Sequence, residues 1–339
     1  MPELDKDLRS IQEARDLASG AFAAWKQWSS ATQEQVDRVC AAMAEVAIDA
    51  SERLGRDAHF ETGYGVPEHK RLKNLFASRD VWESIKDLKS VGVINHDPEK
   101  RIYDIAWPID VIAALTPSTN PTSTVMFKIL VAVKARNAIV VAPHPSAAKC
   151  CYETTRIMAQ AAVDNGAPPG LISCMQNISL DGTQALMRHK YTALILATGG
   201  TPMVRAAHST GKPAIGVGPG NVPAYVDRSA DLEKAARYIV ASKSFDCSTI
   251  CATEQSVVAD KPIAGKLAAL MQREGAYFTT PQETDLLRKL LFYPDGTMNT
   301  AVVGKPADYV AAMAGFDIPR GTRILITRIQ RTGKEDPLS

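Results

Sequence analysis

Two cysteines four residues apart are the side chains of this chain best suited to covalent chemistry. Cys247 and Cys251 lie in a segment rich in serine and threonine, between a helical pattern and the β-branched pair Val257 and Val258. A thiol at a loop end beside a strand can be both exposed and held in place, as a nucleophile requires. Spacing alone nevertheless favours the commoner interpretation, because most cysteines are small hydrophobic side chains buried in a core.

A second polar segment follows a short apolar run and opens a helical pattern. Its residues Thr116, Pro117, Ser118 and Asn120 would lie beyond the carboxyl end of a strand, where parallel sheets bind ligands. An ordinary strand–turn–helix connection with Thr122 as the N-cap explains the same residues equally well. The sequence alone leaves both interpretations open.

Three further turns contain residues that suit a nucleotide site. The strand pattern at 137–145 ends in a Pro-His-Pro turn, where a histidine such as His144 is more often a turn or packing residue. Thr198, Gly199 and Gly200 join a strand to a helix, and paired glycines let backbone N–H groups approach a pyrophosphate. That glycine pair is not the G-x-G-x-x-G fingerprint. The glycine- and proline-rich stretch 211–223 indicates a tight turn after a strand.

Together these segments resemble those of the CoA-acylating aldehyde dehydrogenases, and the resemblance extends from about residue 32 to residue 338. The run Ser-Thr-Ile-Cys-Ala-Thr-Glu-Gln-Ser resembles the nucleophile segment of that family, which implies that Cys251 is the catalytic thiol and Cys247 a variable neighbour. The run Thr-Pro-Ser-Thr-Asn-Pro-Thr-Ser resembles a second family motif. It implies that the Asn120 amide and the Cys251 backbone N–H form an oxyanion hole.

The resemblance also implies a site for NAD, or NADP, and a role for coenzyme A as co-substrate. The residues expected at the dinucleotide, with no proton transfer assigned to the histidine, are Thr116, Pro117, Ser118, His144, Pro145, Thr198, Gly199, Gly200 and Gly218. Hydrolytic members of the wider family have a water-activating glutamate at the position that aligns with Val217. Because valine cannot accept a proton, the acyl-enzyme should resist water until CoA attacks.

The expected reaction is therefore the reversible, NAD-dependent oxidation of a short aldehyde to its acyl-CoA through a cysteine thioester. Acetaldehyde, propanal and sulfoacetaldehyde all remain candidates. Family members continue beyond the region of Ser339 into a Glu-Lys-Leu-Ser-Pro motif, so we expect this chain to be truncated and its catalytic domain incomplete. One alternative is accordingly an inactive, assembly-type remnant that binds nucleotide or partner subunits. Another is a hydrolytic aldehyde dehydrogenase that releases free acid.

Composition excludes several other classes of function. A net charge of +2 gives no reason to expect nucleic acid or an anionic membrane as a partner, and no apolar run approaches about 18 residues. The N-terminus lacks the apolar core of a secretory signal. Six cysteines in 339 residues suggest no disulfide framework, and none has zinc spacing, so we expect no metal. These features predict a reduced cytoplasmic protein, and the resemblance adds the inside of a bacterial microcompartment as an alternative location.

The elements that must position these residues begin with helices. Alanine-rich periodicity predicts a helix over 8–28, and Thr32-Gln-Glu-Gln fits a capping box that opens a second helix. A third helical pattern follows Pro67 and would direct its apolar side chains, Leu72, Leu75, Phe76 and Trp82, toward one face. Strands at 90–95 and 101–107 form a predicted hairpin. The resemblance implies that this hairpin serves oligomerisation, and that the protein is a homodimer or homotetramer if its C-terminus is complete.

Beyond residue 110, short apolar runs alternate with helical patterns, which predicts βαβ units and a mostly parallel sheet. The expected strands are 111–115, 138–142, 171–175, 193–197 and 214–217, followed after the cysteine segment by 255–258, 301–303 and 323–327. The predicted fold class is α/β and aldehyde dehydrogenase-like. A doubly wound Rossmann-type NAD-binding domain would span residues 1–242, and an incomplete α/β catalytic domain would span 243–339.

Overall fold

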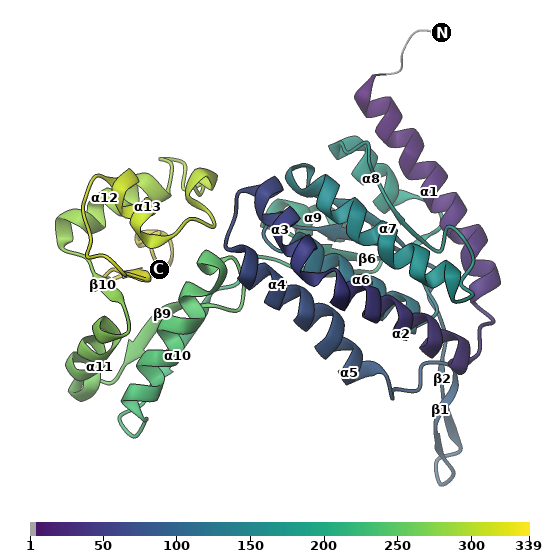
Figure 1. Cartoon of the computed structure of the whole chain (residues 1–339), viewed down its shortest axis with the longest axis horizontal. Coiled ribbons are helices and arrows are strands. Elements are labelled where there is room, and N and C mark those ends of the chain that lie inside the picture. The colour runs from purple at the N-terminus through teal and green to yellow at the C-terminus, as the bar shows by residue number, and fades with distance from the viewer. Residues whose placement is uncertain (1–4) are drawn as a thin grey trace. The chain divides into compact units, whose positions relative to one another are not determined.

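The structure, a computed structural model, describes residues 5–339 and groups them into two compact units (Figure 1). The first unit comprises the described residues through Thr62 together with Pro67–Pro219, and the second comprises Gly63–Val66 and Gly220–Ser339. The division therefore lies at residues 219 and 220, not at the expected 242 and 243. The reason is pairing: strand β8 (Val222–Val226) joins β9 (Glu254–Ala259), on the other side of the expected boundary.

A five-stranded parallel sheet forms the centre of the first unit, as the alternating pattern predicted. Its order is β5-β4-β3-β6-β7. The strands are β3 (Val111–Thr116), β4 (Ala138–Pro143), β5 (Ile172–Cys174), β6 (Thr192–Thr198) and β7 (Ala214–Val217). Every residue of β3 and β4 is buried, which explains why these runs are continuously apolar instead of alternating.

The helices between these strands make the sheet doubly wound. They are α6 (Pro121–Lys134), α7 (Ala148–Asp164), α8 (Leu180–Arg188) and α9 (Thr201–His208). The chain passes from β3 outward to β4 and β5, and then returns through α8 to β6 on the other side of β3. The strand order reverses between β3 and β6, and ligands of such sheets bind beyond the strand ends at this switch point.

Of three long N-terminal helices, the first packs on this sheet and the other two pack on helices beside it. They are α1 (Lys6–Trp28), α2 (Gln33–Asp49) and α3 (Ser51–Thr62); α1 contacts β3–β5 and α8, and α2 packs against α6 and α7 (Figure 1). Four of the six buried residues of α1 are alanine, so much of this helix can approach its neighbours closely. The predicted capping box is confirmed, since Thr32 accepts the Gln35 N–H and the Gln35 side chain accepts the Thr32 N–H.

The third predicted helix differs from expectation in which face it buries. It consists of α4 (Pro67–Leu75), a π-helical turn (Phe76–Asp80) and α5 (Val81–Ile85). Leu72 and Phe76 are 41% and 65% exposed, whereas Lys70, Lys73 and Asn74 are buried, so the predicted apolar face is wrong for this part. The physical reason is that the buried polar groups have specific partners in the first unit, which outweigh the hydrophobic preference. Trp82 does pack against the core, as predicted.

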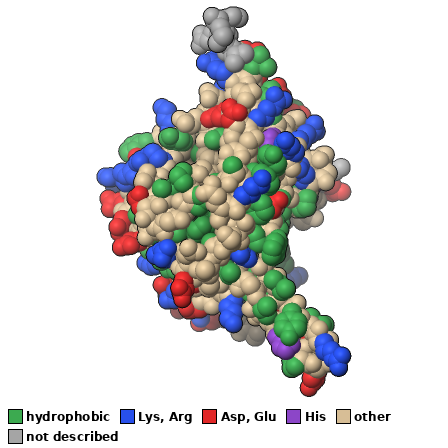
Figure 2. Space-filling view, turned by 90° about the vertical axis from the view of Figure 1, so that its right-hand side faces the viewer, with side chains coloured by type: hydrophobic (Ala, Val, Ile, Leu, Met, Phe, Trp, Pro, Cys, Tyr) green, Lys and Arg blue, Asp and Glu red, His purple; other side chains and the backbone are tan. Residues whose placement is uncertain are grey.

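The predicted hairpin is confirmed, with β1 (Gly92–Asp97) antiparallel to β2 (Ile102–Ala106). It exposes several large apolar side chains, namely Val93, Ile94, Ile102, Tyr103 and Ile105. Figure 2 shows hydrophobic side chains over this hairpin, which projects at the bottom of that view. An exposed apolar hairpin of this kind suits contact with another chain.

The second unit contains two small parallel sheets, β8–β9 and β10–β11, formed with β10 (Ala276–Phe278) and β11 (Ile324–Ile326). Its helices are α10 (Leu232–Ser244), α11 (Lys261–Arg273), α12 (Pro281–Leu291) and α13 (Ala307–Ala314). The predicted strand at 301–303 is wrong. That stretch forms a 3₁₀ turn, Thr300–Val302, because the Asn299 side chain accepts the Ala301 N–H and closes the chain locally. In the described part of the chain, no helix has both the length and the hydrophobicity to cross a bilayer.

Candidate active site

Cys251 is the exposed cysteine among the residues that the structure describes. It lies on the turn between the 3₁₀ segment Phe245–Ser248 and strand β9, whereas Cys40, Cys150, Cys151 and Cys174 are buried and Cys247 is half-buried. Burial raises the pKa of the Cys40 thiol to about 12 and that of Cys174 further, so both remain protonated at neutral pH. Because the thiolate is the nucleophile, the two cysteines of the predicted segment, Cys247 and Cys251, are the candidates for covalent catalysis.

The turn that leads to Cys251 has an unusual backbone. Asp246, Cys247 and Ser248 have φ values of 49°, 50° and 63°, in the left-handed region that costs a residue with a side chain about 1–2 kcal/mol. Three such residues in succession persist only where their surroundings hold them. Nothing in the sequence indicates this conformation, since none of the three is glycine.

The buried Asp246 carboxylate supplies that support. It accepts the Val66 N–H at 2.6 Å and the Thr249 hydroxyl at 2.7 Å. Gly65 has φ +68°, and a Cβ placed on it would collide with the Asp246 carboxylate, so glycine is required at that position. The short segment Gly63–Val66 is thereby joined to the cysteine turn inside the second unit.

The backbone around Cys251 is also closely packed. A Cβ on Gly220 would collide with the Cys251 carbonyl oxygen, so this glycine permits the two backbones to touch. The Thr253 N–H donates to the Ile250 oxygen at 3.2 Å and closes the turn that contains the cysteine. At the start of the segment, burial lowers the pKa of Lys243 to about 8, although Glu254 opposes the shift.

Asn120 stands at the N-cap position of α6 but does not cap it with its side chain. Its Oδ1 accepts from Lys73 Nζ at 2.6 Å, and its Nδ2 donates to Thr119 Oγ1 at 3.2 Å. The alternative in which Thr122 caps the helix is wrong, since the helix begins at Pro121 and the Thr122 hydroxyl instead donates to buried Asn74. The Asn120 amide is therefore held by side chains and is not used to begin a helix.

All nine predicted cofactor residues lie at the carboxyl-end edge of the sheet. They end or follow β3 (Thr116–Ser118), β4 (His144 and Pro145), β6 (Thr198–Gly200) and β7 (Gly218). Backbone bonds join neighbouring turns, from His144 N–H to the Thr116 oxygen and from Gly199 N–H to the Val217 oxygen, both at 3.1 Å. The side chain of Thr116, however, is buried beneath this edge, with its hydroxyl 3.6 Å from the Cys151 sulfur.

The backbone of this edge is open enough for a dinucleotide, and the edge also lies where such sheets bind one. A Cβ on Gly199 or Gly200 would make only ordinary contacts, at 3.5 and 3.7 Å, and one on Gly218 would meet nothing within 4 Å. Packing therefore does not require these three glycines, and they leave the backbone open to a ligand. Gly216 differs, because a Cβ there would lie 2.5 Å from Val204 of α9. Beside these turns, desolvation lowers the pKa of the His144 ring, although much of the residue is exposed.

Sequence reasoning missed two buried lysines in the first unit. Lys128, 3% exposed, donates to the carbonyl oxygens of Leu115 at 2.6 Å and Leu196 at 2.8 Å, and so joins β3 to β6 at the switch point. Burial lowers the pKa of Lys128 to about 7. A lysine inside the apolar run of α6 was a signal that could have identified it. Lys73 had no such signal, because it lies opposite the apolar side chains of α4.

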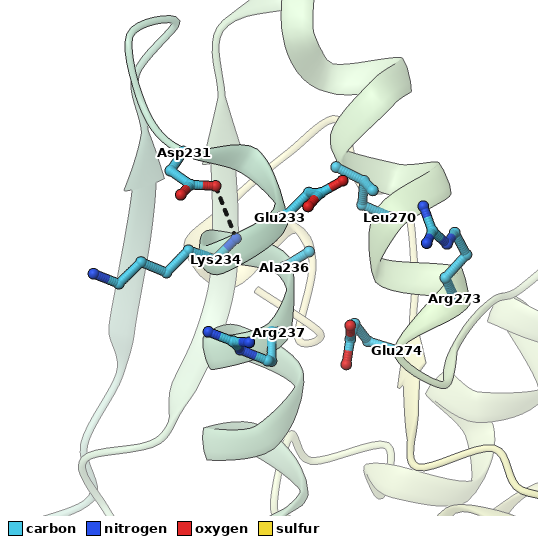
Figure 3. Close-up of a pocket in the computed structure, with 8 residues that line it drawn as sticks. All are labelled: Asp231, Glu233, Lys234, Ala236, Arg237, Leu270, Arg273 and Glu274. Carbon is cyan, nitrogen blue, oxygen red and sulfur yellow. Dashed lines mark hydrogen bonds between the residues drawn. The ribbon is translucent and has the colours of Figure 1, made fainter.

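A pocket of about 340 Å³ in the second unit is a poor alternative site (Figure 3). It lies between the beginning of α10 and the end of α11, and charged side chains of both signs line it: Asp231, Glu233, Lys234, Arg237, Arg273 and Glu274. Asp231 is occupied as the N-cap of α10, where it accepts the Lys234 N–H at 3.1 Å. The cysteine turn follows the opposite end of α10. Within the described chain, no three His, Cys, Asp or Glu side chains gather as metal ligands.

Comparison with known proteins gives matches over nearly the whole chain. The model of the aldehyde dehydrogenase family matches residues 5–283. An aldehyde-alcohol dehydrogenase of Clostridium acetobutylicum is 42% identical over 337 residues, which are 99% of this chain but only 38% of that protein. The crystal structure of an acetylating aldehyde dehydrogenase from Geobacillus thermoglucosidasius is 48% identical, with a TM-score of 0.96 over 99% of this chain and 74% of that one.

A third match carries ligands. The propionaldehyde dehydrogenase of Rhodopseudomonas palustris, solved with bound CoA and an acylated cysteine, is 30% identical, with a TM-score of 0.84. The match covers 96% of this chain and 73% of that one. These similarities confirm the predicted α/β fold class, and the resemblance noted in the sequence is confirmed with it.

Proposed function

The chain belongs to the aldehyde dehydrogenase family, and on that premise we propose that it oxidises a short aldehyde to its acyl-CoA through a thioester on Cys251. The overall reaction is aldehyde + CoA + NAD⁺ → acyl-CoA + NADH + H⁺, with NADP as an alternative acceptor. The observation that carries the proposal is the single exposed thiol, on a braced turn, within the segment that resembles the family nucleophile. The acylated cysteine and the CoA of the Rhodopseudomonas palustris enzyme support it.

In this proposal Cys251 attacks the aldehyde carbon as the thiolate, and a carbon–sulfur bond forms while the carbonyl oxygen becomes an anion. The Asn120 amide and the Cys251 backbone N–H donate to that oxygen, and each such donor is worth about 2.7–4 kcal/mol in characterised enzymes. The dinucleotide, when bound, supplies a two-electron acceptor. The acyl group then remains on Cys251 as a thioester, and the sulfur leaves again when the CoA thiol attacks the acyl carbon.

The choice of CoA over water depends on what lies near the acyl group. Val217, at the end of β7, is a hydrocarbon side chain at the position where hydrolytic relatives are expected to have a glutamate. Without a base to take its proton, water is a poor nucleophile toward a thioester. CoA instead brings a thiol whose thiolate fraction is appreciable near pH 8.

The nine residues at the edge of the sheet would hold the dinucleotide. They surround the switch point between β3 and β6, where doubly wound sheets bind nucleotides, and three of their glycines are not required by packing. We further propose that the apolar hairpin β1–β2 contacts a second copy of the chain. The cytoplasm, free or inside a microcompartment, is the expected location, because a catalytic thiol must be reduced and the cytoplasm keeps thiols reduced.

Steady-state NADH formation from short aldehydes, with and without CoA, tests this function. We expect sustained turnover with acyl-CoA as product when CoA is present, and only a single burst without it. Cys251→Ala should abolish both, and the matched variant Cys247→Ala should not. Equal rates without CoA, with free acid as product, would establish a hydrolytic enzyme. Calorimetric NAD binding without NADH from any short aldehyde plus CoA would establish a binding protein.

A further inference from the structure

Two buried lysines of α4 contact the turn that carries Asn120. Lys73, 8% exposed, places Nζ 2.6 Å from Asn120 Oδ1, and Lys70, 2% exposed, places Nζ 3.1 Å from the Thr119 oxygen. Burying an ammonium group costs free energy that apolar packing would not. α4 leaves Leu72 exposed and the π-helical turn after it leaves Phe76 exposed, so hydrophobic burial does not explain the orientation of α4. The contacts with the turn explain it better.

The bond from Lys73 determines which way the Asn120 amide faces. The two ends of this amide are nearly equal in size, but only the oxygen can accept a hydrogen bond from an ammonium group, which has no acceptor. Contact with Lys73 therefore fixes Oδ1 on the lysine side and Nδ2 on the other. Nδ2, which has two N–H groups, is then on the side away from the lysine, where it donates to Thr119 Oγ1 at 3.2 Å.

The same bond also makes the amide a stronger donor. A cation at the amide oxygen draws electron density from the nitrogen, and hydrogen bonds linked in this way strengthen one another. An oxyanion hole is effective because its donors are in place before the negative charge develops. Fixed orientation and added polarity are what such a donor needs.

We propose that Lys73 is a positioning residue of the oxyanion hole, which fixes and polarises the Asn120 amide; this inference rests on the proposed role of Asn120. Lys73 itself need not touch the substrate. Its effect on the reaction passes through Asn120. A residue that acts through another cannot contribute more than that other residue does, which sets the upper limit of its effect.

The test compares two reactions of Cys251 that need neither dinucleotide nor CoA. p-Nitrophenyl acetate acylates the thiolate through a tetrahedral oxyanion and releases nitrophenolate, whereas iodoacetamide alkylates it by direct displacement of iodide, with no oxyanion. Asn120→Ala should slow acylation by about 10²–10³. Lys73→Met should slow acylation by about tenfold to a hundredfold, and by less than about threefold in the Asn120→Ala background. Alkylation should stay within about twofold throughout.

Lys134→Met is the matched control. Lys134 is also a buried lysine of the first unit, at the other end of α6, where its ammonium pairs with Asp37 and the Lys86 oxygen. Acylation per folded molecule should be unchanged in this variant. If Lys73→Met does not fold, Lys73→Gln takes its place in the comparison with and without Asn120→Ala, and retains a hydrogen-bond donor in the buried position. It should slow acylation by about threefold to tenfold, and not at all in the Asn120→Ala background.

The proposal fails if loss of the Lys73 ammonium slows acylation equally in both backgrounds, does not slow it, or slows alkylation as much. Failure of the proposed function would look different. In that case the acylation cycle behaves as described, but the unmodified protein forms no NADH from aldehyde and CoA. If NADH formation is normal but the effects of Lys73→Met and Asn120→Ala on acylation simply add, the positioning role alone is refuted.

Discussion

Replacing Lys128 by methionine should remove a pH dependence from the stability of the first unit. The Lys128 ammonium lies between two strand carbonyls and is 3% exposed, and burial lowers its pKa from 10.5 to about 7. Between these two pH values the unfolded chain binds a proton at this site that the folded chain does not. Stability contributed by this site therefore rises with pH through that window.

The size of the effect follows from the shift. With a folded pKa of about 7, the free energy of unfolding should gain about 3.5 kcal/mol between pH 7 and pH 10 from Lys128 alone, as an order of magnitude. Lys128→Met removes both the titration and two hydrogen bonds, which cost about 1–3 kcal/mol each when a buried group loses its partner. The free energy of unfolding of the variant should therefore be closest to that of the unmodified protein at pH 7 and furthest below it at pH 10.

Urea unfolding at pH 7 and pH 10, followed by tryptophan fluorescence, measures this directly. All four tryptophans, at positions 25, 28, 82 and 107, lie in the first unit, so their emission reports that unit alone. Leu130→Ala, an uncharged change at a fully buried position of the same helix, should cost about 2–5 kcal/mol at both pH values. If Lys128→Met also lowers the free energy of unfolding equally at pH 7 and pH 10, the ammonium is not held in the low dielectric that this reasoning requires.

Three further predictions concern the cysteine turn and the fate of the thioester. Asp246→Ala should destabilise the second unit by about 2–4 kcal/mol, because the Val66 N–H and the Thr249 hydroxyl lose their acceptor, whereas Asp246→Asn should retain most of that stability. Chemical unfolding followed by circular dichroism measures both variants, and equal losses of stability would contradict the bracing role of the carboxylate. Cys247→Asn should raise stability by about 0.5–1 kcal/mol, since asparagine tolerates the left-handed backbone better; a lower unfolding midpoint would argue against strain. Val217→Glu should raise CoA-independent NADH turnover by supplying a base for water; an unchanged rate together with intact CoA-dependent turnover would show that residue 217 does not govern hydrolysis.

The sheet, and the edge at which we propose that the dinucleotide binds, could be predicted because local pattern and tertiary structure agree there. Strands β3 and β4 are buried at every residue, so their apolar runs stand out from the helices between them. Once the strands are parallel, the residues that follow them must share one edge, which brings His144 and Gly199 near the same switch point. The capping box at Thr32 was predictable for a similar reason, since both partners lie within one turn.

What the sequence did not predict depends on contacts between distant residues. Lys73 is buried by a partner 47 positions away, and Asp246 is buried by one 180 positions away. No local periodicity contains either contact, so hydrophobic patterning directed Phe76 inward, whereas the structure exposes Phe76 and buries Lys73. The left-handed turn at Asp246 depends on the same long-range bond. The unit boundary was missed because β8 pairs with a strand that lies beyond the cysteine turn.

The most direct test of the central claim is the mass of the protein after reaction with a short aldehyde and NAD in the absence of CoA. We predict one acyl group per chain, which fragmentation of the tryptic peptide Ser244–Lys266 assigns to Cys251 and not to Cys247. Addition of CoA should remove this group within one turnover and yield acyl-CoA, whereas buffer alone should leave it in place. An acyl group on Cys247, or one lost to water as free acid as fast as to CoA, would contradict the account.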